Sequence, residues 1–113
     1  MNELFPTKTR LALLRDVGRG TVLRFPNGES RQHFDDGTYT VINALIGELE
    51  QAGWVRVGGV ETSGPYRSIN QRARLWQLTR AGEAVLAAAA RAAEAAEEAL
   101  QAALGGGPVA TDV

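Results

Sequence analysis

The fold is decided by the stretch TVINALIGELEQAGWV, residues 40–55. Its apolar side chains recur at spacings of three and four, which is the pattern of a helix with one buried face. These positions are Val41, Ile42, Leu45, Ile46 and Leu49. Gly53 stands where a left-handed residue ends a helix, and the next four residues have the alternation and β-propensity of a strand. We therefore predict an amphipathic helix over residues 41–52 that leads directly into a strand.

Downstream, the sequence predicts a second strand that returns beside the first. Residues 72–78, RARLWQL, alternate polar and apolar side chains, and the connection over residues 58–65 contains several glycines. Residues 51–80 contain five arginines and one acid, so the tip of this hairpin is basic. Trp54 and Trp76 flank the two strands, and we predict that they lie in the core at the base of the hairpin.

Upstream, we predict a first helix and a β-hairpin. Thr7 or Thr9 can cap the helix, which Gly18 and Gly20 should end. Residues 21–25 and 30–34 have strand character, and Asn27-Gly28 between them supplies the positive φ angles of a tight turn. A short helix over residues 30–34 is the alternative. Residues 35–37, DDG, are interpreted as a break whose carboxylates face the positive end of the next helix, with Thr38 or Thr40 as its cap.

The last third of the chain predicts one long helix. Residues 79–104 are rich in alanine, the best helix former, and Thr79 is a suitable cap. The run GGGP at residues 105–108 should end the helix. The predicted organisation is a folded domain over residues 1–78, a helix over residues 79–104 and a flexible tail over residues 105–113.

The charge is distributed unevenly along the chain. The net charge is only −1, but residues 1–80 contain eleven of the twelve cationic side chains and residues 81–113 contain one. All but one of these cations are arginine, whose rigid fork of donors suits phosphate and guanine. A GC-rich coding sequence would also explain the preference for arginine, although it would not explain the clustering. We predict a basic body that contacts an anionic partner and an acidic C-terminal helix.

The sequence lacks the constellations that catalysis or metal binding requires. It contains no cysteine, which excludes disulfides, thiolate zinc sites and cysteine nucleophiles. His33 is the single histidine and has no metal-ligand spacing to Asp35 and Asp36. The glycine runs lack the Lys-Ser/Thr of a phosphate loop. We expect a cytoplasmic protein that is not an enzyme, has no cofactor or metal and does not contact a membrane.

Two segments resemble winged helix-turn-helix transcriptional regulators. Residues 40–55 resemble the recognition helix and the first wing strand of that family, in which a helix of the form LxxLexxGxV turns straight into the wing. Residues 75–82, LWQLTRAG, look like the return strand of the wing and the helix start common in the MarR- and PadR-like branches. The resemblance implies an α+β fold: a helix, a β-hairpin or strand, a recognition helix and a two-stranded wing, followed by the long C-terminal helix. The hairpin-like segment at residues 25–34 departs from the family, which places a positioning helix there.

The resemblance also implies a DNA-binding surface. Such proteins insert the recognition helix into the major groove and lay the wing on the backbone or in the minor groove. Carried over to this sequence, the groove-facing residues are Thr38, Tyr39, Thr40 and Asn43, and the wing contacts are Tyr66, Arg67, Ser68, Arg72 and Arg74. Asn43 is the candidate for pairing with adenine, although it and Thr40 could also be ordinary exposed helix residues. Arg24 and Arg31, on the arms of the first hairpin, are possible additional contacts.

The function implied is a sequence-specific DNA-binding transcriptional regulator, expected to be a repressor, that acts as a homodimer on double-stranded DNA. The C-terminal helix would pair the two copies through a stripe of apolar residues: Val85, Leu86, Ala89, Ala93, Leu100 and Leu104. A small-molecule effector is left open. The alternative is a non-catalytic protein-interaction module or inhibitor on the same scaffold, which the near-neutral net charge favours.

Overall fold

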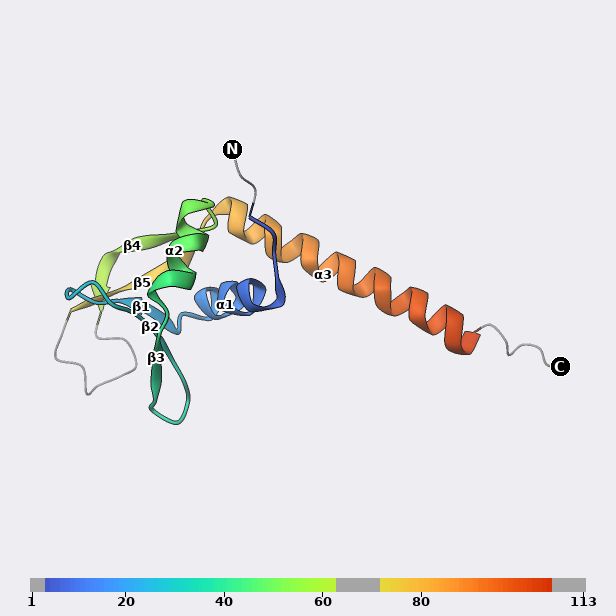
Figure 1. The fold of residues 1–113 in the computed structure, drawn as a ribbon, viewed down its shortest axis with the longest axis horizontal. Helices are drawn as coiled ribbons and strands as arrows, with labels where there is room; N and C mark the ends of the chain where they lie inside the picture. Colours follow the sequence, from blue (N-terminus) through green and yellow to red (C-terminus); the bar gives the residue numbers. More distant parts are fainter. Residues whose placement is uncertain (1–3, 63–71, 107–113) are drawn as a thin grey trace.

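A computed structural model describes residues 4–62 and 72–106 (Figure 1). The described residues form an α+β fold of three α-helices and five strands, which confirms the predicted fold class. The elements in chain order are α1 (Lys8–Arg19), β1 (Val22–Arg24), β2 (Ser30–His33), β3 (Tyr39–Val41), α2 (Asn43–Gln51), β4 (Val55–Thr62), β5 (Ala73–Leu78), α3 (Arg80–Gln101) and a π-helical segment, η1 (Ala102–Gly106). In this part of the chain, no helix is both long and apolar enough to cross a membrane.

All five strands belong to one antiparallel sheet of order β3-β2-β1-β5-β4. β1 therefore lies between β2 and β5, with Leu23 opposite Leu75 and Arg24 opposite Arg74. The pairing of β4 with β5 is interrupted by a register shift between Val57 and Glu61. β3 and β4 are the two edges of the sheet.

The first two hairpins are closed by the same turn. In each turn, the carbonyl of a phenylalanine accepts a hydrogen bond from the N–H of the glycine three residues later. The N–H of the same phenylalanine donates to the carbonyl of the residue after that glycine. The two turns are Phe25–Glu29 and Phe34–Thr38. Gly28 and Gly37 have φ near +90°, and no other residue of either turn has a positive φ. These are three-residue hairpin loops with a left-handed glycine, because that conformation costs glycine no steric penalty.

This geometry decides three sequence predictions. The hairpin over residues 21–34 is confirmed, and the alternative helix over residues 30–34 is wrong. Asn27 does not adopt a positive φ; instead, its side chain accepts a hydrogen bond from the Glu29 N–H at 2.9 Å. The DDG stretch is the second hairpin turn and does not face a helix end. There Asp36 accepts from the N–H and the hydroxyl of Thr38, and these hydrogen bonds lower the Asp36 pKa.

The central helix begins two residues later than predicted. The β-branched residues of TVI extend a strand, so β3 occupies positions that the periodicity assigned to the helix. Ile42 is at the cap position, without a side-chain cap, and its N–H donates to the Ser30 carbonyl at 2.9 Å. Neither Thr38 nor Thr40 is the cap of α2. The side chain of Asn43 instead accepts a hydrogen bond from the Ser30 N–H at 2.7 Å, which ties the start of α2 to β2.

The start of α1 follows the sequence prediction, with Thr7 accepting a hydrogen bond from the Arg10 N–H. Its end differs in one respect: Gly20 adopts the left-handed conformation that ends the helix, whereas Gly18 lies inside it. A Cβ on Gly18 would come within 3.2 Å of the Leu78 side chain. Gly18 therefore permits close packing between α1 and the end of β5.

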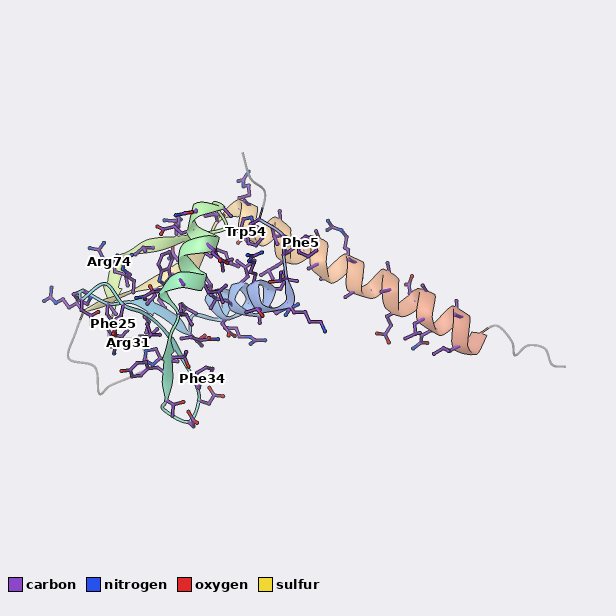
Figure 2. All side chains as sticks on the ribbon, viewed as in Figure 1. Phe5, Phe25, Arg31, Phe34, Trp54 and Arg74 are labelled. Carbon is purple, nitrogen blue, oxygen red and sulfur yellow. The ribbon has the colours of Figure 1, made fainter. Side chains whose placement is uncertain are left out.

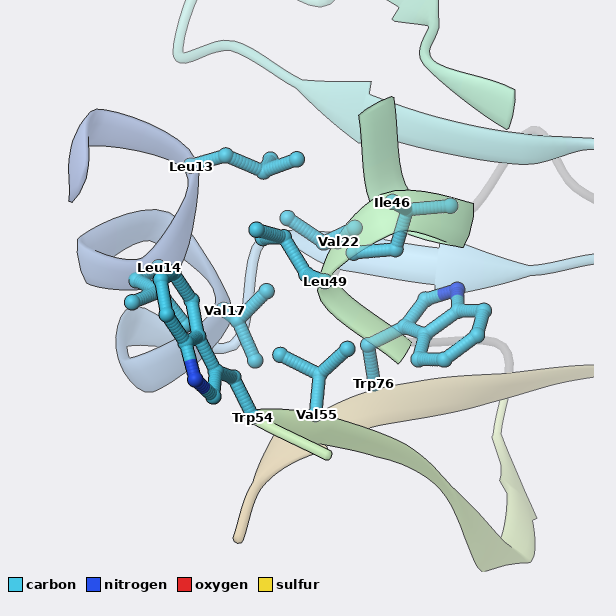
Figure 3. Packing of buried hydrophobic residues seen from close by; sticks show 9 residues of the cluster. All are labelled: Leu13, Leu14, Val17, Val22, Ile46, Leu49, Trp54, Val55 and Trp76. Atoms are coloured by element: carbon cyan, nitrogen blue, oxygen red, sulfur yellow. The ribbon is translucent and has the colours of Figure 1, made fainter. Parts of the chain in front are cut away.

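Helices α1 and α2 cover one face of the sheet, and the main core lies between them and the strands (Figure 3). Trp76 is fully buried there, and its indole N–H donates to the Ser30 hydroxyl at 3.0 Å. Trp54 is buried in the same core, as predicted. The nine buried residues of this core are Leu13, Leu14, Val17, Val22, Ile46, Leu49, Trp54, Val55 and Trp76.

A second, smaller cluster lies on the other face of the sheet, because successive strand residues point to opposite sides. Leu23 and Ala73 belong to this cluster. Val22, the neighbour of Leu23 in the chain, points toward the helices and belongs to the main core. Phe25 and Leu75 complete the cluster.

The C-terminal helix is confirmed, and its two halves have different surroundings. Thr79 caps it by accepting a hydrogen bond from the Gly82 N–H at 3.0 Å. Val85 and Leu86 pack against the main core, but every residue from Arg91 to Leu104 is exposed. The helix leaves the body as an extended arm, and the molecule reaches 67 Å along its longest axis (Figure 1). The π-helical segment η1 continues the chain from Ala102 to Gly106.

Candidate nucleic-acid interface

The outer face of α2 is acidic. Its exposed residues are Asn43, Ala44, Glu48, Glu50 and Gln51, and α2 contains no cationic residue. Glu48 accepts a hydrogen bond from the Arg10 side chain at 3.1 Å. A helix that carries carboxylates toward solvent repels a phosphate backbone. Electrostatic attraction to an anion therefore has to come from other elements.

Three of the residues predicted on the groove-facing side of a recognition helix are not in the helix. Thr38 closes the second turn, whereas Tyr39 and Thr40 lie in the edge strand β3. Asn43 is the first residue of α2, but its side-chain oxygen is already engaged by the Ser30 N–H. Two-point pairing with adenine needs that oxygen as well as the amide NH₂. The structure therefore corrects the positions of the first three residues and gives Asn43 a role inside the fold.

The basic residues of the predicted wing divide into two groups. Tyr66, Arg67 and Ser68 lie outside the described residues. Arg72 and Arg74 are described, and both are exposed, Arg72 just before β5 and Arg74 within it.

Arg74 of β5 lies directly opposite Arg24 of β1. Figure 2 shows Arg74 at the same end of the molecule as Phe25, the residue that follows Arg24. Arg24, Arg72 and Arg74 line one hollow of about 450 Å³. We call this the basic hollow; its other lining residues are Phe25, Pro26 and Val57. None of these lining residues is acidic. On its other side, Arg74 is paired in register with Glu61 of β4.

The Arg24–Arg74 pair is electrostatically unfavourable in isolation. Like charges directly opposite each other on neighbouring strands destabilise a sheet. Guanidinium groups cannot relieve the repulsion by losing a proton, because their pKa lies far above physiological pH. An anion bound between them reverses the sign of the interaction. The basic hollow is therefore the place on the described surface where phosphate binding has the clearest physical basis.

Arg31, the other arginine predicted on the first hairpin, has a different role. Its guanidinium lies 4.2 Å from the Phe25 ring centroid and 4.4 Å from that of Tyr39, and it forms an ion pair with Glu29 at 2.7 Å. Stacking between two rings and pairing with a carboxylate fix the side chain on the face opposite the helices. The structure thus assigns Arg31 to the stability of the hairpin, and its role as a possible DNA contact stays a prediction.

His33 lies on the same side of β2 as Arg31. It is buried, and its ring centroid is 6.1 Å from that of Phe25 and 5.6 Å from that of Tyr39. Burial, together with the nearby Arg31 charge, lowers the His33 pKa and favours the neutral ring at neutral pH. The described residues contain no group of three or more histidine, aspartate or glutamate side chains placed to hold a metal ion.

The predicted dimer stripe is also divided by the structure. Val85 and Leu86 are half-buried against the core of their own chain, and Ala89 is half-buried as well. Ala93, Leu100 and Leu104 are exposed, the last two at 57% and 72%. The surface left for a second copy therefore begins after Ala89.

Sequence reasoning missed the pairing of Arg24 with Arg74 and the repetition of the turn. The turn left a local signal in the pattern F-x-[N/D]-G-x, which occurs at residues 25–29 and 34–38. The pairing left none, because it depends on β1 lying beside β5, some fifty residues apart in the chain. Comparisons with protein-family profiles, curated proteins and solved structures found no match.

Proposed function

We propose that this protein is a DNA-binding transcriptional regulator that contacts the phosphate backbone through the basic hollow. The observation that carries the proposal is the opposed pair Arg24 and Arg74, with Arg72 beside them. Arginine forks match phosphate oxygens with two parallel hydrogen bonds. The protein is proposed to act by binding alone, without catalysis.

The order of elements supports the same proposal. Without the β2–β3 hairpin, the chain order is helix, strand, helix, two strands and helix, which resembles winged helix-turn-helix regulators. In this interpretation α2 takes the place of the recognition helix, β4 and β5 form the base of the wing, and the β2–β3 hairpin replaces the positioning helix. Because the outer face of α2 is acidic, backbone contacts by the arginines would supply most of the affinity.

The proposed regulator is a homodimer joined by the distal part of α3. An apolar seam follows alternating three- and four-residue steps along this helix, the spacing of a coiled coil. Its members are Leu86, Ala89, Ala93, Ala96, Leu100 and Ala103. The proximal end of the seam packs on its own core, so two parallel helices would bring both bodies into the same space. We therefore propose an antiparallel pair in which the exposed seams overlap.

DNA binding is tested by fluorescence anisotropy with labelled duplexes at several salt concentrations. Arg24→Gln and Arg74→Gln should each weaken binding at least tenfold, as expected for a charged phosphate contact of about 1.5–3 kcal/mol. They should also reduce the dependence on salt, because fewer counterions are released. Arg15→Gln is the matched control, since Arg15 is exposed on α1 and does not line the hollow. Equal losses in all three variants would contradict the assignment of the hollow.

The helix arrangement is tested by cysteine cross-linking, which the absence of natural cysteines makes simple. In an antiparallel pair, position 104 lies opposite the region near residue 92, so Leu104→Cys should not form a disulfide with its own copy. A cysteine near the middle of the overlap, as in Ala99→Cys, should form one. Efficient cross-linking of Leu104→Cys with itself would exclude the antiparallel pair.

A protein-interaction module is the second candidate. It is favoured by the exposed apolar side chains on and beside the edge strand β3, which are Phe34, Tyr39 and Val41. An edge strand offers unpaired backbone groups to another chain. If this function holds, the anisotropy assay should show no duplex binding at physiological salt, and the arginine variants should behave like Arg15→Gln.

A further inference from the structure

The volume of the basic hollow is larger than the space that a single backbone phosphate would occupy. Its volume of about 450 Å³ falls within the range of small-molecule sites, roughly 300–1,000 Å³. A phosphate held between Arg24 and Arg74 would occupy only the charged side of this space. The remaining volume is large enough for a group attached to that phosphate.

The two sides of the hollow differ in chemistry. Arg24, Arg72 and Arg74 supply the charged side, while the exposed Pro26 and the half-buried Val57 supply apolar surface. Phe25 borders the hollow, but its side chain is buried. The Pro26 ring is exposed at the tip of the first hairpin, and Val57 lies where the β4–β5 register shifts. A ligand that uses both sides carries a phosphate next to a ring with an apolar face.

We propose that the basic hollow binds a phosphorylated nucleoside, with its phosphate between Arg24 and Arg74 and its base against Pro26 and Val57. The inference deepens the proposed function and rests on the same arginines. The nucleotide has two possible sources, a free nucleotide or the phosphorylated end of a nucleic-acid strand. An internal phosphate of a duplex would not use the apolar side, because its base is stacked and paired inside the helix.

Isothermal titration with the full-length protein tests the chemistry of the ligand. The probes are adenosine and guanosine 5′-monophosphate, the corresponding nucleosides and inorganic phosphate. We expect the nucleotides to bind at least tenfold more tightly than inorganic phosphate, and the nucleosides to bind most weakly. Equal affinities for nucleotide and inorganic phosphate would overturn the proposal, and so would the absence of nucleotide binding.

Three variants test the location of the ligand. Arg74→Gln should weaken nucleotide binding at least tenfold. Pro26→Ala should weaken nucleotide binding severalfold and leave the affinity for inorganic phosphate unchanged, because it alters only the apolar side. Arg15→Gln should match the unchanged protein. Circular dichroism verifies that each variant is folded, and unchanged nucleotide affinity in a folded Arg74→Gln protein would overturn the proposal.

Glu61 offers a variant with the opposite expected sign. Its Cα is paired with that of Arg74 across β4 and β5. Glu61→Gln removes one negative charge from the strand that pairs with Arg74, so it should tighten nucleotide binding a few fold. A weaker affinity in Glu61→Gln would contradict an anion site at Arg74.

A competition experiment distinguishes this proposal from the proposed DNA binding. Linear duplexes with 5′-phosphate and 5′-hydroxyl ends are compared with a closed circular duplex, each with and without added nucleotide. Preference for 5′-phosphate ends, abolished by nucleotide, indicates the strand end as the source. Nucleotide binding with no duplex binding supports the free nucleotide and overturns the proposed regulator. Binding to circular duplex that nucleotide does not affect supports the regulator and overturns the nucleotide site.

Discussion

The two halves of α3 are both rich in alanine but have opposite surroundings. Both contain scattered charged residues among the alanines. The first turns pack against the core through Val85 and Leu86, whereas every residue from Arg91 to Leu104 is exposed. Alanine makes the helix stable enough to continue without support. The comparison shows that helix propensity sets the length of this element, while a few larger residues set where it is attached.

The largest effect is expected at the attachment point, from Gly82→Ala. A Cβ at this position would overlap the backbone carbonyl oxygen of Trp54, which cannot move without disturbing the start of β4. We expect the free energy of unfolding to fall by about 3 kcal/mol, as in strongly overpacked cores. Urea denaturation measures this change.

Gly47→Ala provides the matched control, because Gly47 lies in α2 with no atom within 4 Å of the position of its missing Cβ. This substitution should raise the unfolding free energy by roughly 0.5–1 kcal/mol through helix propensity. A similar effect of the two substitutions would mean that α3 is not anchored at Gly82.

The next effect is expected at Leu86, which is half-buried against the main core. Leu86→Ala should lower the unfolding free energy by about 2 kcal/mol, near the lower limit for a leucine lost from a core. Leu100→Ala removes the same atoms from an exposed position of the distal half. In dilute protein, where a dimer dissociates, Leu100→Ala should leave the unfolding free energy nearly unchanged.

The distal half should matter for association. Leu100→Glu combined with Leu104→Glu places one charge on the exposed seam and one directly beside it. We expect the dissociation constant of the dimer to rise at least tenfold, or about 1.4 kcal/mol. Sedimentation velocity over a range of concentrations measures this. Monomers at all concentrations in the unchanged protein would refute the dimer, and dimers in the double variant would refute the seam.

The smallest effects are expected when an alanine is replaced by glycine in the proximal half of α3 and, in a separate variant, in the distal half. Ala84→Gly and Ala95→Gly both replace an exposed alanine of α3 by the poorest helix former apart from proline. In dilute protein, Ala84→Gly should lower the unfolding free energy by about 1 kcal/mol, because the proximal half unfolds with the body. Ala95→Gly should reduce the helical circular dichroism signal with almost no change in unfolding midpoint. Equal shifts of the midpoint would show that the helix unfolds as one unit with the body.

The sequence predicted the elements whose signals are local. The cap at Thr7, the helix end at Gly53, the first hairpin and the long C-terminal helix all follow from a few neighbouring residues. The start of α2 was placed too early because Val41 and Ile42 fit both a helical spacing and a strand. The pairing of β3 with β2 decided between them, and that pairing is a tertiary contact.

The candidate site was predicted less completely than the fold. The sequence marks Arg24, Arg72 and Arg74 as candidate contacts, but their convergence depends on the sheet order β1-β5-β4. The stacking of Arg31 between Phe25 and Tyr39 likewise brings together three strands or turns. The sequence shows which residues are charged. Whether two charged side chains lie side by side depends on the pairing register of strands that are distant in sequence.

Gly82 also gives the long helix the properties of a lever. The helix spans about 33 Å from this contact at 1.5 Å per residue, so a tilt of about 10° at its base displaces the far end by roughly 6 Å. The point about which the helix would tilt is Gly82, which packs against the carbonyl of Trp54, one residue before β4. Small movements of the β4–β5 hairpin would therefore produce larger displacements at the far end of α3. Because Gly82 has no Cβ, α3 can pack directly against the Trp54 carbonyl, and this contact sets the direction of the helix.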